Sequence, residues 1–345
     1  MVTEPKTSEA QMRERKPTLR TLSERTGFAI TTVSRALKND PQISETTRKT
    51  VATAARDIGY VPDRAAQRLR TGRTKVINLL INPSHEFLGF TNELLSGITT
   101  ALRGTGYSVT IVPDFIGADR IEAVRNILRN NLADGMVFTR TETFDERVRL
   151  LLEADFPFVS HGRTEFSVPH PFVDFDNEAF ARQAVERLVN RGRSRLAIIL
   201  PEARFTFAQH LRYGFLSAAR DIGVEHEIIG DVTLDSAPEA MAARIGTRLT
   251  QSDAPDGLVC VGEVSALATL AAMHDCGKTL GVELDLVAKR ASPVFDLLRP
   301  RVDTMFEDIE ASGRDIGTLL LRRIEGEPAE DLNVLHQPKP EFSVS

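Results

Sequence analysis

A short segment near the N-terminus, AITTVSRALKND (residues 29–40), gathers side chains whose chemistry suits phosphates and base edges. Val33 and Leu37 are four residues apart and would face inward together on a helix. The face left over carries hydroxyl groups and one guanidinium, from Thr31, Thr32, Ser34 and Arg35. Such groups hold phosphate oxygens and read base edges. The segment is therefore expected to contact nucleic acid.

Three short helices are needed to position this segment. Apolar residues recur at helical spacing from Thr18 onward and are interrupted by Gly27 and by Asn39-Asp40-Pro41. This pattern predicts helices near residues 19–26, 30–38 and 46–58, the third with Ser44 as its N-cap and Gly59 just beyond its end. A short joint at Gly27 between two helices with facing apolar sides is typical of a helix-turn-helix.

The charge is divided unevenly along the 345 residues. The head, residues 1–74, carries 15 Lys/Arg and 8 Asp/Glu, a net charge of +7. The body, residues 75–345, carries 28 Lys/Arg and 40 Asp/Glu, a net charge of −12. Only the head is expected to meet a polyanion, the alternative being a solvated basic tail.

Two parts of the head have weaker signals. Residues 1–17 are polar and show no periodicity, which predicts a disordered extension. After Pro62, the run DRAAQRLRTGRT could form a helix from Asp63 to about Arg70 before Gly72 ends it. A helix this short is marginal in water, so it should form only with a partner helix and DNA. An ordinary basic linker is the alternative.

The body alternates apolar runs with amphipathic stretches. Ten runs read as strands: KVINLLI, YSVTIVP, DGMVFTR, FPFVSHG, PFVDF, RLAIILP, EIIGDVTL, DGLVCVG, LDLVAKR and VDTMF. Continuous apolar strands separated by helices indicate parallel sheets covered on both faces. About half of the runs precede residue 175, which favours an α/β body of two doubly wound subdomains. Facing sheets of this kind make a ligand cleft at the carboxyl ends of their strands.

Signals for catalysis, metals and membranes are missing from the sequence. The seven histidines form no His-x-x-x-His or His-x-His pair, and no nucleophile elbow or phosphate-binding loop occurs. Cys260 and Cys276 read as reduced, buried thiols. No apolar run approaches the length of a membrane span, and residues 1–20 lack a secretory apolar stretch. We expect a cytoplasmic protein with no cofactor, no catalytic residue, no metal and no membrane partner.

The head, from Thr18 to Thr74, closely resembles the lactose-repressor (LacI/GalR-type) transcription regulators. Matches to the family pattern are Thr18-Leu19, Gly27, Thr32-Val33-Ser34-Arg35, Leu37, Gly59-Tyr60 and Pro62. The body from Lys75 to about Phe342 is similar in layout to the family's effector domain, which resembles periplasmic sugar-binding proteins. Its motifs are looser than those of the head.

This resemblance implies a domain layout and a function. The expected parts are a helix-turn-helix domain (18–62), a hinge helix (63–74) and an effector-binding and dimerisation domain (75–345). Within the effector-binding domain, an N-subdomain would comprise about residues 75–175 and 303–327. A C-subdomain would comprise about residues 176–302 and 328–345. The implied protein is a homodimeric repressor that binds operator DNA under the control of a small effector. The alternative is an enzyme that acts on a sugar-like substrate and carries a DNA-binding head.

The expected DNA contacts follow from position on the recognition helix and hinge. Ile30 and Thr31 should meet base edges in the major groove, with Arg35 suited to guanine. Leu69 should wedge between base steps in the minor groove. The full expected set is Thr18, Ile30, Thr31, Thr32, Ser34, Arg35, Ala66, Leu69 and Arg70.

The expected effector contacts lie at the ends of strands or in the loops after them. They are His85, Phe90, Asp114, Arg163, Asp176, His210, Glu263 and Lys289. The resemblance places Asp176 and Arg163 nearest the family's ligand positions.

The sequence also departs from the family pattern at four places, one of them Asp63, which replaces the usual Asn before the hinge. Ala29 stands where the family usually has a capping Ser, and Leu211 stands where the family usually has an effector-contacting Arg. Lys289-Arg290 stand where many relatives have an Asp. Cations in place of that carboxylate suggest a ligand that carries a carboxylate or phosphate, so the expected effector is a carbohydrate or an acidic sugar derivative.

Overall fold

The computed structural model describes residues 17–61, 68, 71–82, 89–114 and 120–343. It separates into two compact units, Met1–Thr74 and Lys75–Ser345, which are the head and the body. The expected extension at residues 1–17 falls almost wholly outside the described residues, as does most of the expected hinge helix.

The head contains the three expected helices, α1 (Leu19–Thr26), α2 (Ile30–Ala36) and α3 (Glu45–Asp57). The Thr18 hydroxyl accepts a hydrogen bond from the Thr21 amide at the start of α1, and Ser44 does the same for Thr47 in α3. Gly27 adopts a φ of 74°, the left-handed conformation that lets the chain turn between α1 and α2. Ala29 makes no side-chain cap for α2.

A small apolar core holds the head together. Its buried members come from all three helices and are Leu22, Val33, Ala36, Val51 and Ala55. The inward position of Val33 confirms the face of α2 that the sequence assigned to the core. The opposite face of α2 is therefore left for contacts outside the head.

The N-subdomain of the body is a parallel sheet between two layers of helices. Its strands are β1 (Val76–Ile81), β2 (Ser108–Pro113), β3 (Gly135–Phe138), β4 (Phe158–His161), β5 (Phe172–Phe175) and β11 (Asn333–His336), in the order β11-β5-β4-β3-β1-β2. Helices α5 (Phe90–Ala101) and α12 (Ile309–Ile324) share one apolar cluster with the sheet. Helices α6 (Arg120–Arg129) and α7 (Glu146–Glu153) share a second cluster on its other face.

The C-subdomain repeats this plan. Its strands are β6 (Arg195–Ile198), β7 (Glu225–Ile228), β8 (Gly257–Cys260), β9 (Asp285–Arg290), β10 (Asp303–Phe306) and β12 (Lys339–Glu341), in the order β12-β10-β9-β8-β6-β7. Only the β10–β12 pair in this sheet is antiparallel. Helix α8 (Asn177–Asn190) packs with α9 (Thr206–Ile222), and α10 (Pro238–Leu249) packs with α11 (Glu263–Asp275). Short 3-10 turns occupy Pro293–Leu297 and Ala329–Asp331.

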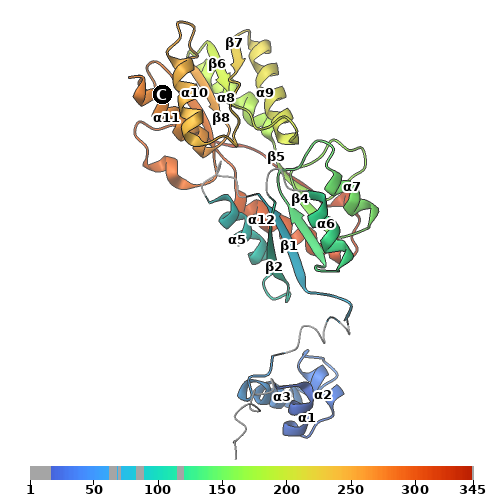
Figure 1. Cartoon of the computed structure of the whole chain (residues 1–345). Helices are drawn as coiled ribbons and strands as arrows, with labels where there is room; N and C mark the ends of the chain where they lie inside the picture. The colour runs from blue at the N-terminus through green and yellow to red at the C-terminus, as the bar shows by residue number, and fades with distance from the viewer. Residues whose placement is uncertain (1–16, 62–67, 69–70, 83–88, 115–119, 344–345) are drawn as a thin grey trace, which may run out of the picture. The chain divides into compact units, whose positions relative to one another are not determined.

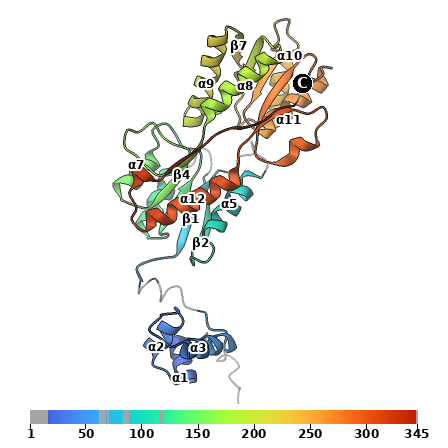
Figure 2. The same ribbon diagram turned by 180° about the vertical axis from the view of Figure 1, so that it is seen from behind.

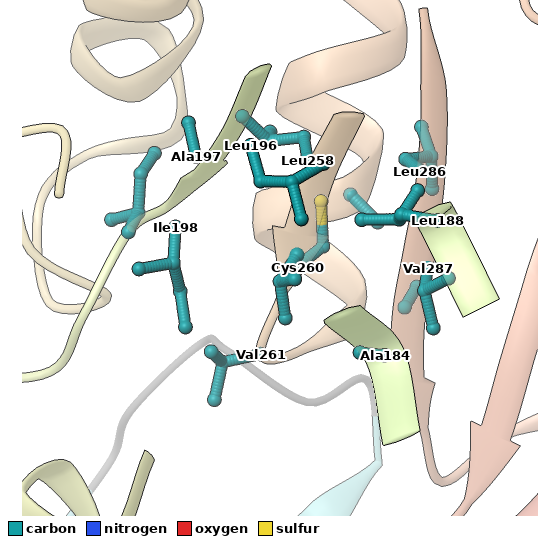
Figure 3. Packing of buried hydrophobic residues seen from close by; sticks show 14 of the residues in the cluster. Ala184, Leu188, Leu196, Ala197, Ile198, Leu258, Cys260, Val261, Leu286 and Val287 are labelled. Carbon is teal, nitrogen blue, oxygen red and sulfur yellow. The ribbon is translucent and has the colours of Figure 1, made fainter. Parts of the chain in front are cut away.

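One continuous core fills the C-subdomain. Side chains from strands β6, β8 and β9 meet side chains of α8 within it (Figure 3). Cys260 is buried in this core as expected, whereas Cys276 is only half-buried, at the end of α11. The two-subdomain α/β fold is thus confirmed, and both faces of each sheet are covered.

The subdomain limits differ from the expected ones at two places. Residues 303–306 form β10, which pairs with β9 of the C-subdomain rather than joining the N-subdomain. Residues 333–336 form β11, which pairs with β5 of the N-subdomain. The chain passes between the subdomains after β5, after β10 and after β11 (Figures 1 and 2). Chain length and composition do not reveal to which subdomain a strand belongs when it lies next to such a crossing.

The limits of single strands also differ. Both β11 and β12 were missed, because they are short, partly or wholly exposed, and lack an apolar run. The run EIIGDVTL forms no strand after Ile228, since Gly230 and Asp231 turn the chain, the latter with a φ of 67°. No helix among the described residues is long and apolar enough to cross a bilayer.

Glycine allows α5 and α12 to approach closely. The two helices lie side by side in both overall views (Figures 1 and 2). A Cβ atom at Gly97 would lie 2.1 Å from the carbonyl oxygen of Glu310, closer than any real contact. This packing fixes one wall of the N-subdomain.

We expect Gly97→Ala to destabilise the body by about 1–3 kcal/mol, because the added methyl forces the helices apart. Gly246→Ala, also within a helix, is the matched control, since its Cβ would meet no atom nearer than 3.8 Å. There the helix propensity of Ala should raise stability by about 0.5–1 kcal/mol. The free energy of unfolding in urea, measured for both variants and the wild type, tests the two expected changes in stability. Equal effects would contradict the steric argument.

Candidate functional site

The exposed face of α2 is the candidate site in the head. Ile30 is 46% exposed despite its apolar side chain, and Thr31 and Arg35 are exposed beside it. Thr32 and Ser34 are half-buried on the flanks of this face. Thr18 is exposed at the N-cap of α1. Of the other expected DNA contacts, Ala66, Leu69 and Arg70 lie outside the described residues.

Arg35 is oriented by the turn that follows its helix. Its Nε donates to the carboxylate of Asp40 at 2.8 Å, and its Nη2 contacts Gln42. The hydrogen bond from Arg35 lowers the pKa of Asp40. The pair is exposed to solvent, so exchanging Asp40 for another acceptor costs little.

A cleft between the two sheets is the candidate site in the body. It encloses about 790 Å³, including its open mouth. Its walls come mainly from the carboxyl ends of strands in both subdomains, as expected for open α/β sheets. The described lining residues are Asn82, Phe90, Thr139, Arg140, His161, Asp174, Asn177, Pro201, Phe207, Leu234, Val261, Lys289 and Glu307. Of these lining residues, Phe90 and Lys289 were among the effector contacts expected from the sequence.

Lys289 is neutralised by Glu307, the residue that follows the neighbouring strand β10. Its Nζ lies 2.9 Å from Oε2 of Glu307 and donates to Oδ1 of Asn177, also at 2.9 Å. The ammonium group also lies 4.8 Å from the ring centre of Phe175. Because Lys289 and Glu307 are each about 3% exposed, the two charges form a buried pair at the cleft wall.

A second pair of charges involves Asp174 of β5. Burial raises the pKa of this carboxyl group, although the nearby Arg163 opposes the shift. The Arg163 Nε lies 3.4 Å from its Oδ2. Arg163 also approaches His210 at 3.4 Å, and His210 contacts Glu165 at 3.1 Å. Arg163 and His210 thus contact each other and the carboxylates of Asp174 and Glu165, and neither is among the described lining residues.

The remaining lining residues are aromatic or neutral. The His161 ring meets Phe90 edge-on at 5.6 Å, and burial lowers the pKa of His161, which favours the neutral imidazole. Its Nε2 is buried with no hydrogen-bond partner among the described residues. Phe207, Leu234 and Val261 add apolar surface. The cleft thus offers aromatic surface beside neutral hydrogen-bonding groups.

Several expected effector residues have structural roles instead. Asp176 caps α8 by accepting from the Ala179 amide. Glu263, which is fully buried, accepts from the amides of Ala291 and Ser292. Leu211 points into the core, so the family's arginine position provides no polar contact here. His85 lies outside the described residues.

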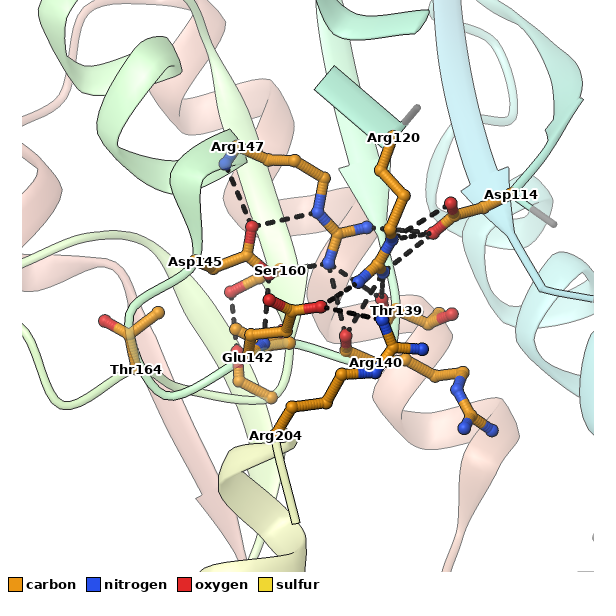
Figure 4. A network of polar contacts seen from close by, with 12 residues as sticks. Asp114, Arg120, Thr139, Arg140, Glu142, Asp145, Arg147, Ser160, Thr164 and Arg204 are labelled. Atoms are coloured by element: carbon orange, nitrogen blue, oxygen red, sulfur yellow. Dashed lines mark hydrogen bonds and ion pairs between the residues drawn. The ribbon is translucent and has the colours of Figure 1, made fainter. Parts of the chain in front are cut away.

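Asp114 belongs to a buried network next to the cleft, not to its described lining (Figure 4). It binds Arg120 through both carboxylate oxygens and Arg147 at 3.0 Å. The Nε and Nη2 groups of Arg147 donate to the carboxylate of Asp145. Burial would raise the pKa of Asp145, but its bonds to Arg147 outweigh burial and hold the pKa below its ordinary value.

Seven polar lining residues were missed from the sequence: Asn82, Thr139, Arg140, His161, Asp174, Asn177 and Glu307. Each lies in a strand or within two residues of its end, so strand ends taken systematically would have found them. The described residues contain no group of three or more His, Cys, Asp or Glu that could hold a metal ion.

Comparisons with known protein families match the two units separately. Residues 18–63 match the model of bacterial regulatory proteins of the lacI family. Residues 185–342 match the model of a periplasmic binding protein-like domain.

Curated relatives span nearly the whole chain. The HTH-type transcriptional regulator CelR of Thermobifida fusca is 28% identical over 334 residues, covering 94% of this chain and 96% of its own. AglR of Rhizobium meliloti (strain 1021), also an HTH-type transcriptional regulator, is 28% identical over 321 residues, covering 88% and 86%.

Solved structures share the fold. A complex of the transcriptional regulator CelR with cellobiose has a TM-score of 0.68 at 24% identity, covering 95% of this chain and 99% of its own. The lac repressor dimer bound to operator and the anti-inducer ONPF has a TM-score of 0.80 at 20% identity, covering 94% and 98%.

These relatives are named as transcription regulators, which excludes the alternative of an enzyme with a DNA-binding head. A lacI-type helix-turn-helix precedes a periplasmic binding protein-like body in one chain. Over nearly its whole length the chain resembles HTH-type transcriptional regulators of this kind.

Proposed function

We propose that this chain is an operator-binding repressor whose DNA affinity is controlled by a neutral carbohydrate in the cleft of its body. The observation that carries the proposal is the joining of a lacI-type helix-turn-helix to a binding protein-like cleft whose lining charges are paired. The relatives bound to cellobiose and to operator support the two halves of the proposal.

In the head, the exposed start of α2 enters the major groove. Ile30 offers apolar surface to a thymine methyl group, Thr31 a hydroxyl, and Arg35 a fork that fits guanine. Thr18, Thr32 and Ser34 hold phosphates around it. Arg35 leaves Asp40 to reach its base, at little cost because that pair is exposed.

Arg35→Ala is expected to relax discrimination at one operator position by about 1–3 kcal/mol. Arg20→Ala is a suitable control, because Arg20 is 82% exposed and its one ion pair among the described residues is with Glu24 on its own helix. Affinities of both variants for single-base operator variants, measured at one salt concentration, check this. A uniform loss on every sequence would show that Arg35 contacts only phosphate.

In the body, paired charges favour a neutral ligand over an anion. Lys289 is matched by Glu307, Arg140 by Asp235, and Asp174 by Arg163. The expected preference for a carboxylate or phosphate rested on Lys289 and Arg290 as cations in place of a carboxylate, and their pairing with Glu307 and Glu341 removes that basis. Carboxylate and amide oxygens accept from sugar hydroxyls, while Phe90 and Phe207 cover apolar sugar faces.

A thermal stability screen tests the proposed effector class. A ligand at 100 times its dissociation constant adds about 2.7 kcal/mol to stability. We expect neutral mono- and oligosaccharides to include a stabilising ligand, and their phosphate and carboxylate derivatives to stabilise less. Stabilisation by the acidic derivatives alone would contradict the neutral class.

We propose in addition that the active form is a homodimer. Two heads related by two-fold symmetry read the two halves of a palindromic operator. The lac repressor dimer bound to its operator supports this arrangement. Sedimentation of the full chain should give twice its 38.1 kDa mass, and a monomer at concentrations that saturate operator would contradict it.

A further inference from the structure

One side of the cleft is spanned by a bridge between the subdomains, at some distance in sequence from the three chain crossings. The bridge joins residues 139–143, which follow β3, to residues 204–206 at the start of α9. The Thr143 amide donates to the Arg204 carbonyl at 3.2 Å, and the Thr206 amide to the Thr141 carbonyl at 3.1 Å. Glu142 and Phe205 thereby form an isolated antiparallel β-bridge.

Ion pairs reinforce this bridge. The Arg140 guanidinium contacts the carboxylate of Asp235, which lies in the C-subdomain after β7, and the two side chains are only 14% and 11% exposed. The same guanidinium lies 4.3 Å from the ring centre of Phe205. Glu142 pairs with Arg204 at 3.3 Å. Of these four charged residues, Arg140 is the one that lines the cavity.

The buried network next to the cleft fixes the conformation of Arg140 (Figure 4). Arg140 has a φ of 55°, a left-handed backbone that a long side chain rarely adopts. Nη2 of Arg147 donates to the carbonyls of Thr139 and Arg140, at 3.3 and 3.2 Å, and Arg120 contacts the same two carbonyls. Arg147 is 1% exposed, so these bonds form away from competing water.

We propose that the Arg140–Asp235 pair is a latch that holds the cleft closed before the effector binds, and that Arg120 and Arg147 are its positioning residues. An effector that contacts both walls binds the closed arrangement. By favouring that arrangement in advance, the latch raises the effector affinity of the chain. The affinity step rests on the proposed function, whereas the latch itself is a property of the body.

Hydrogen exchange of the full chain without sugar tests the latch directly, because two bridge amides cross the cleft. Asp235→Asn should speed exchange of the amides of Thr143 and Thr206 about tenfold, as expected for a largely buried ion pair. Exchange in β1 and β8 should stay as in the wild type. Asp231→Asn is the matched control, being the same change in the same loop at a carboxylate that is 88% exposed.

A double-variant comparison separates the latch from general loosening of the fold. Arg140→Gln should accelerate the same two amides, and adding Asp235→Asn to it should accelerate them little further. Additive effects of the two changes would overturn the latch. So would wild-type exchange at both amides in Asp235→Asn.

Calorimetry with the sugar found in the stability screen tests the affinity step. Asp235→Asn should bind that sugar about tenfold more weakly than the wild type or Asp231→Asn. Unchanged or tighter binding in Asp235→Asn would overturn the role of the latch in affinity. If the exchange results hold but no sugar binds any variant, the latch stands and the proposed effector class fails.

Discussion

Removing residues 1–74 is expected to abolish operator binding while leaving the effector affinity of the body intact. The head carries a net charge of +7, whereas the body carries −12 and repels the phosphate backbone. The two parts are separate compact units, so each keeps its own core. The loss should exceed about a thousandfold, the usual range of specific over non-specific affinity.

Titration of a labelled operator with the full chain and with residues 75–345 measures this effect. The affinity of the full chain should also fall steeply with salt, because each phosphate that a cation neutralises releases counterions. Calorimetry of the fragment with the effector is the control for its folding. Specific operator binding by the fragment would place the DNA contacts outside the head.

Lys289→Met is expected to destabilise the body by about 3–5 kcal/mol, because it leaves the buried carboxylate of Glu307 without its ion-pair partner. Lys289→Met combined with Glu307→Gln should recover most of that loss, since no charge then remains at this place. Lys339→Met is the matched surface control. Lys339 is 64% exposed and 3.9 Å from Asp308, so its removal should change stability by less than about 0.5 kcal/mol.

Urea unfolding of these variants decides between a structural and a ligand-binding Lys289. If Lys289→Met keeps wild-type stability but loses all response to effector, Lys289 contacts the ligand directly and an anionic effector regains support. A large loss of stability that Glu307→Gln relieves identifies the pair as part of the cleft wall.

The three helices of the head could be predicted from the sequence because their signals are local. Gly27 marks the turn, Ser44 the start of α3, and Val33 the buried face of α2, and each lies within a few residues of its consequence. Tertiary contacts inside so small a unit do not override these signals.

The cleft could be predicted only in outline, because its partners are distant in sequence. The rule that ligands bind at strand ends selected Phe90 and Lys289, which line the cleft. It did not show that Glu307, just after the neighbouring strand, would neutralise Lys289, since that pairing depends on strand order.

Asp114 and Glu263 illustrate the same limit. A carboxylate after a strand reads as a ligand contact, but burial beside Arg147 or beside two backbone amides makes it part of the framework. The crossing after β11 was hidden for a related reason, because β11 and β12 are short edge strands that carry little apolar pattern.

The most direct test of the account is the coupling between the two sites of the full chain. Operator affinity is measured with and without a saturating neutral sugar, and sugar affinity with and without saturating operator, at one salt concentration. We predict that the sugar weakens operator binding by about 5- to 150-fold and that operator weakens sugar binding by the same factor, as linkage requires. Tight binding of both ligands with no change in either affinity would contradict the account.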